Sequence, residues 1–89
     1  METLKTIQEN YSYGFLLYNE YVHKVYDYFE VVGLSFGDEL LRKYRAVVSA
    51  ERVLRDEYPS GCDELESVAN HLYALLAAEV ECLVQKLLK

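Results

Sequence analysis

Two carboxylates, Glu51 and Glu79, fall among the apolar residues of predicted helices, where an unpaired buried charge is costly. Together with His71 they could ligate a metal ion, as inward carboxylates do in metal-binding helical bundles. Such a site needs further inward Glu and His residues, and the first third of the chain supplies tyrosines and aliphatics instead. The alternative is that Glu51 pairs with Arg55 or with the hydroxyl of a tyrosine in the first predicted helix, and Glu79 with Lys86 or water. We favour this alternative and expect no cofactor.

A second set of polar residues, Glu20, His23 and Asp27, has the Glu-x-x-His spacing of di-iron bundles. It has no second copy and lies opposite the apolar face, which predicts a solvated helix surface. Cys62 lies at a predicted helix N-terminus, where thiols are activated, but no base can be placed beside it. Cys82 follows twenty residues later. On one helix the two would lie about 30 Å apart, beyond disulfide reach, so we expect free thiols, a reducing compartment and no enzyme.

A stripe of arginines, Arg42, Arg45 and Arg52, follows the outer side of a predicted helix and could contact phosphates. Acids in the same segment neutralise it, and the whole chain carries a net charge of −6. This balance favours a salt-bridged surface, or contact with the acidic helices of another subunit, and disfavours nucleic acid and anionic membranes as partners.

Tyrosine accounts for most of the aromatic residues, with nine Tyr against three Phe. Tyrosine combines apolar area with one polar tip, a combination that is enriched at protein interfaces. The alternative is a core edge in which the rings are buried and the hydroxyls reach water. We favour the interface, because the first helix carries more apolar residues than one core face requires. The predicted interface residues are Tyr11, Tyr13, Leu16, Leu17, Tyr18, Tyr21 and Tyr28.

The helices that position these residues can be delimited from the few glycine and proline residues in the chain. These residues predict breaks at Gly33–Gly37 and Pro59–Gly61. Between these breaks, helical periodicity predicts three helices, at about residues 3–32, 37–57 and 62–88. The first carries an apolar seam at spacings of three and four, with Gly14 on the seam as a close approach or a kink. Gly33 is placed to end it as a left-handed residue. Short connections predict an all-α, three-helix up-down-up bundle in one domain, 1–89, completed by homodimerisation through the first helix.

The overall composition fits one folded domain, since 52% of the 89 residues are hydrophobic. We see neither a secretory signal nor an uninterrupted membrane span, and expect a cytoplasmic protein. The sequence therefore predicts a small, acidic, non-enzymatic interaction protein, acting as an adaptor, an inhibitor or an assembly subunit. The alternatives are a metal- or ligand-binding bundle using Glu51, Glu79 and His71, and a nucleic-acid regulator using the arginines.

Overall fold

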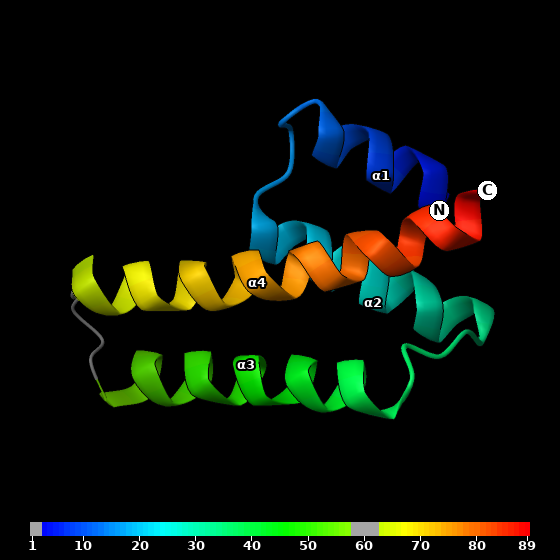
Figure 1. The fold of residues 1–89 in the computed structure, drawn as a ribbon. Helices are drawn as coiled ribbons and strands as arrows, with labels where there is room; N and C mark the ends of the chain where they lie inside the picture. The colour runs from blue at the N-terminus through cyan, green and yellow to red at the C-terminus, as the bar shows by residue number, and fades with distance from the viewer. Residues whose placement is uncertain (1–2, 58–62) are drawn as a thin grey trace.

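A computed structural model describes the backbone of residues 3–57 and 63–89 and the side chains of residues 3–57 and 67–89. Within these ranges the chain is all-helical, with helices α1 (Leu4–Ser12), α2 (Tyr18–Val32), α3 (Asp38–Glu57) and α4 (Asp63–Leu88), as Figure 1 shows. The all-α prediction is confirmed, and the last two helices each begin within one residue of the predicted position. The predicted break at Pro59–Gly61 and the thiol of Cys62 lie outside the described residues.

The predicted single helix over residues 3–32 is wrong, because the chain reverses at Gly14. Gly14 has φ +83°, a left-handed conformation that costs glycine little. Its N–H donates to the Tyr11 carbonyl at 3.1 Å, and the Phe15 N–H donates to the Asn10 carbonyl at 2.9 Å. This pair of bonds is a Schellman motif, which satisfies the carbonyls that the end of α1 leaves without helical partners. The apolar seam is therefore divided between two helices that pack against each other.

Both ends of α2 are capped by local hydrogen bonds. The Glu20 carboxylate accepts a hydrogen bond from the Leu17 N–H at 3.2 Å, and its charge lies near the positive end of the helix dipole. Leu17 has no side-chain acceptor, so only this half of a capping box is present. At the other end Gly33 has φ +78°, and the Leu34 N–H donates to the Phe29 carbonyl at 2.9 Å. The prediction that Gly33 ends this helix is confirmed.

Helix α4 is the central element of the fold. It lies against α1, α2 and α3, whereas among the described helices the backbone of α3 approaches α4 alone (Figure 1). Helices α2 and α4 run in one direction and α3 runs in the other (Figure 1), but the predicted three-helix count does not hold, because residues 3–32 form two helices. Helix α1, which was predicted to be continuous with α2, folds back along the C-terminal half of α4 (Figure 1). The structure is thus a four-helix arrangement with its C-terminal helix in the middle.

The core lies where α1, α2 and α4 meet. Its buried side chains are Leu4 and Ile7 from α1, Tyr21, Val22, Val25 and Phe29 from α2, and Tyr73, Leu76, Ala77, Val80 and Val84 from α4, with Phe36 from the connection before α3. Full burial of each large aliphatic side chain stabilises the fold by about 1.5–3 kcal/mol. Helix α3 contributes only partly buried residues, and none of its twenty residues, all of them described, is fully buried. One side of the bundle is therefore only two helices thick.

Helix α4 is also apolar in composition. Over Ser67–Leu88 it is long enough, and with a mean hydropathy of 1.2 apolar enough, to cross a membrane by length and composition alone. Core helices of soluble proteins pass the same test when they are mostly buried, but only 28% of this window is buried. Much of the apolar surface of α4 therefore faces outward.

Candidate interaction surface

Four large apolar side chains gather at the connection between α1 and α2, and we call this surface the aromatic patch. Tyr13, Phe15, Leu17 and Tyr18 are 72%, 75%, 68% and 48% exposed. The rings of Tyr13 and Phe15 meet edge to face with their centroids 6.3 Å apart. Because the Schellman motif at Gly14 and the Glu20 cap fix the backbone on both sides, the patch is presented in a defined conformation.

The remaining predicted interface residues lie deeper. Tyr21 is fully buried and belongs to the core, so its side chain is not available to a partner. Tyr11 is half-buried and stacks on Tyr21, with ring centroids 3.9 Å apart and an interplanar angle of 9°. Leu16 and Tyr28 are half-buried against the core. Tyr13, Leu17 and Tyr18 are the predicted residues that the structure leaves on the surface.

Phe15 was not predicted as a surface residue, because helical periodicity across a continuous helix assigns it to the buried face. The signal that could have identified it is Gly14, which directly precedes it. When a glycine ends a helix, the helical periodicity of the residues before it no longer predicts which residues after it are buried. Phe15 instead follows the reversal and points into solvent, with 75% of its side chain exposed.

A polar network that includes the buried residues Gln8 and Tyr21 ties α1, α2 and α4 together. The amide of Gln8 donates to a Glu81 carboxylate oxygen at 3.3 Å and to the Ser12 hydroxyl at 3.4 Å. Its carbonyl oxygen accepts a hydrogen bond from the Tyr21 hydroxyl. Burial, and then the charge of Glu81, raises the pKa of Tyr21 above its ordinary value. Because these hydrogen bonds satisfy the buried polar groups, the network fixes how α1 sits on the core.

A second polar network, centred on His23, joins α2, α3 and α4. The two ring nitrogens of His23 lie 2.9 Å from the Tyr44 hydroxyl and 3.2 Å from the Tyr73 hydroxyl. A neutral imidazole donates through one nitrogen and accepts through the other, so both contacts are satisfied. The predicted solvated face is therefore wrong for His23. Periodicity along α2 could not reveal this, since both hydroxyls come from other helices.

The tyrosines of this network hold their protons tightly. Burial, and then the charge of Asp27, raises the pKa of Tyr44 to about 12. Burial, and then the charge of Glu51, raises the pKa of Tyr73 to about 12. The ring of Tyr26 stacks on that of Tyr44, with centroids 4.4 Å apart and an interplanar angle of 14°. These contacts link the three helices through side chains even where the backbones of α2 and α3 stay apart.

The residues considered as metal ligands have other partners. Glu51 lies 3.7 Å from Arg55, the pairing that we favoured from the sequence, and its charge also acts on Tyr73. Glu79 pairs with Lys43 of α3 at 2.7 Å rather than with Lys86. His71 is exposed. Within the part of the chain that the structure describes, no three His, Cys, Asp or Glu side chains form a group that could hold a metal ion.

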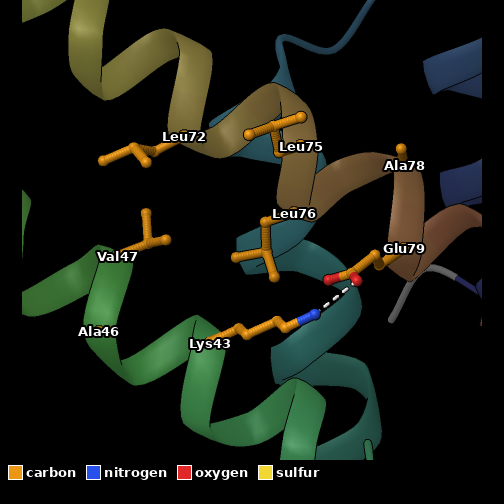
Figure 2. Close-up of a pocket in the computed structure, with 8 residues that line it drawn as sticks. All are labelled: Lys43, Ala46, Val47, Leu72, Leu75, Leu76, Ala78 and Glu79. Carbon is orange, nitrogen blue, oxygen red and sulfur yellow. Dashed lines mark hydrogen bonds and ion pairs between the residues drawn. The ribbon is translucent and has the colours of Figure 1, made fainter.

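A groove of about 590 Å³ runs between α3 and α4, and we call it the α3–α4 groove (Figure 2). The Lys43–Glu79 ion pair lies at one end, and the hydrogen bond to Glu79 raises the pKa of Lys43. Leu75 is 57% exposed. The other lining residues are apolar: Ala46, Val47, Leu72, Leu75, Leu76 and Ala78. The arginines considered for phosphate binding, Arg42, Arg45 and Arg52, are exposed elsewhere on α3.

No protein-family model, curated protein or solved structure matches this chain.

Proposed function

We propose that this protein is a small, non-enzymatic interaction module that binds a partner protein through the aromatic patch. The observation that carries the proposal is the grouping of Tyr13, Phe15, Leu17 and Tyr18 in one connection, each about half exposed or more. Isolated exposed apolar residues are normal on protein surfaces, but contiguous groups mark interaction sites.

The size of the aromatic patch suits the centre of an interface. Taking about 200 Å² per side chain, the four exposed fractions leave roughly 500 Å² in contact with water. A standard protein interface buries about 800 Å² on each partner, with aromatic anchors near its centre and a polar rim around them. The patch would thus supply the anchors, and neighbouring polar residues the rim.

The charge around the aromatic patch indicates the chemistry of the partner. Glu9 and Glu20 are exposed close to the patch in sequence, and the chain as a whole is acidic, with a net charge of −6. Acidic rims steer basic surfaces toward them and give association rates that fall with salt. The expected partner is therefore a protein with an apolar pocket inside a basic rim.

The proposal can be tested by replacing Phe15 with the photo-crosslinking residue benzoylphenylalanine in an extract of the native host. Val31 is the matched control position, because it is 65% exposed on α2 and lies outside the aromatic patch. We expect a discrete crosslinked protein from position 15 only, in a yield that declines with added salt. The same products from both positions, or no discrete product from position 15, would refute the proposal.

Leu17→Ser provides a variant that removes patch area without loss of folding. Leu17 is the N-cap residue of α2, a position at which serine is favoured and leucine is not. The variant should therefore be at least as stable as the wild type in a thermal melt. Its affinity for the crosslinked partner should fall about tenfold, as expected for a residue near an interface centre. Unchanged affinity would show that the partner binds elsewhere.

A further inference from the structure

One half of the α3–α4 pair has none of the other described helices against it. Among the described side chains of α4, from Ser67 on, the buried ones begin at Tyr73, and the core lies on the side of α1 and α2. Beyond it, the C-terminal half of α3 and the N-terminal part of α4 extend as a pair (Figure 1). Val53 and Val68, one from each helix of this pair, are both 52% exposed. A pair of helices alone buries little apolar surface, so this face is suited to a further layer.

The α4 side of the α3–α4 groove is uncharged over a long stretch. From Ser67 to Ala78 the sequence contains no Asp, Glu, Lys or Arg. The charges that line the groove, Lys43 and Glu79, are paired at one end of it, and Glu39 of α3 lies 3.6 Å from the same lysine. An uncharged centre is what distinguishes the core of an interface from ordinary surface.

A second copy of the same face has the matching charge distribution. It brings an apolar centre to an apolar centre and carries its own balanced Lys43–Glu79 pair. A strongly basic partner would instead be attracted to the acidic remainder of the molecule, which carries the net charge of −6. Charge therefore favours a second copy over a basic protein at this face.

The α3–α4 groove combines an exposed leucine with small side chains. Leu75 is among its lining residues and is 57% exposed, and Ala46 and Ala78 contribute small side chains to the lining (Figure 2). Under two-fold symmetry the same patch occurs on both partners, so each leucine can enter the other groove. On α3, Ala46, Ala50 and Val53 continue the row of small residues at helical spacing, which permits close helix approach.

We infer that the α3–α4 groove is the contact between two copies of this chain. Each copy inserts Leu75 into the groove of the other, and α3 and α4 of both copies form a four-helix layer. The contact uses a different surface from the aromatic patch, so a dimer formed in this way leaves both patches accessible.

The size of this face sets the expected strength. From Lys43 to Glu57 it is about 21 Å long at 1.5 Å per residue, and two helices side by side are about 20 Å wide. The resulting plane of roughly 400 Å² on each copy is about half of the roughly 800 Å² that a standard interface buries on each partner. The dimer should therefore dissociate on dilution rather than be permanent.

Sedimentation velocity over a dilution series of the full chain tests the inference. We expect the wild type to shift from monomer to dimer as its concentration rises. Leu75→Asp places a charge in the contact, and Ala46→Arg fills the groove from an exposed position of α3 with a good helix former. Each variant should weaken dimerisation by at least about tenfold. Circular dichroism shows whether both variants keep the helical content of the wild type.

Leu17→Ser is the control, because it alters the aromatic patch and should dimerise like the wild type. Leu75→Asp should in turn retain crosslinking from position 15, so each proposal can fail without the other. A wild type that stays monomeric at every concentration would overturn the inference. So would a dimer that persists in folded Leu75→Asp and Ala46→Arg, or one that is lost in Leu17→Ser. A monomeric chain whose groove binds another protein would likewise assign it a different occupant.

Discussion

Raising the pH above 10 should destabilise the bundle, because the buried tyrosines lose their protons more easily in the unfolded chain. Burial raises the pKa of Tyr73 from 10.0 to about 12, with the charge of Glu51 adding to the effect. Below pH 10 both states keep the proton, and this residue makes no pH-dependent contribution. Between pH 10 and 12 the unfolded chain releases the proton and the folded chain retains it, so the free energy of unfolding falls.

The magnitude follows from the size of the shift. One pKa unit corresponds to about 1.4 kcal/mol, so ionisation of Tyr73, which is 1% exposed, lowers the free energy of unfolding by about 2 kcal/mol by pH 12. Tyr44, whose pKa is also about 12, and Tyr21, whose pKa is raised by burial, add to this loss. A domain of this length has a stability of roughly 4–13 kcal/mol, so the bundle should lose a large part of it.

Urea unfolding followed by circular dichroism, repeated from neutral pH to pH 12, measures the effect for the wild type and for Tyr73→Phe. The phenylalanine keeps the buried ring but has no proton to lose. It should be less stable at neutral pH, because His23 loses a hydrogen-bond partner. Above pH 10, however, its stability should fall less steeply, by about 1.4 kcal/mol per pH unit. Parallel curves for the two proteins would refute the reasoning, as would an intact helical signal after all the tyrosines have ionised.

Three further substitutions test how the elements are held. Gly14→Ala should lower the free energy of unfolding, measured by urea unfolding, by about 1–2 kcal/mol, because alanine is strained at a φ of +83°. A variant that is more stable and has more helix by circular dichroism would mean that Gly14 does not fix the reversal. Gln8→Leu should cost about 1–3 kcal/mol by leaving the Tyr21 hydroxyl and the Glu81 carboxylate unpaired, and adding Tyr21→Phe should recover part of the loss in a double-mutant cycle. Additive effects would argue against a shared network. Ala77→Leu should cost about 1–3 kcal/mol in a thermal or urea melt, because Ala77 is fully buried in the core; a variant as stable as the wild type would reveal unfilled space beside α4.

The helical class and the last two helices were predictable because their signals are local. Apolar periodicity defines a helix face within one segment, and Gly33 ends α2 as its position suggested. The reversal at Gly14 was not predictable in the same way. A glycine inside a helix costs only about 1 kcal/mol, so the sequence admits either a continuous helix or a turn. The choice is made by Leu4 and Ile7, which are buried in the common core once α1 folds back.

The candidate site was predictable only in part, for a related reason. Tyr13, Leu17 and Tyr18 were predicted to be interface residues from residue type and apolar surplus, and the structure exposes their side chains. Tyr21 has the same residue type but is fully buried, since the distinction depends on which way α2 turns after Gly14. His23 shows the same limit, because the hydroxyls that surround it come from α3 and α4. Groups brought together from distant segments leave no periodic signal in any one of them.

The central position of α4 has a consequence for synthesis of the protein in the cell. Helices α1, α2 and α3 are synthesised before the segment from Tyr73 to Val84, so the α4 surface of the core that includes Val22 and Phe29 does not yet exist at that stage. A nine-residue helix such as α1 is marginal in water without tertiary contacts. The nascent chain therefore exposes amphipathic segments until α4 emerges, and this stage of synthesis is when chaperones and proteases can act on it. A ribosome that stalls before Val80 leaves a product without a complete core.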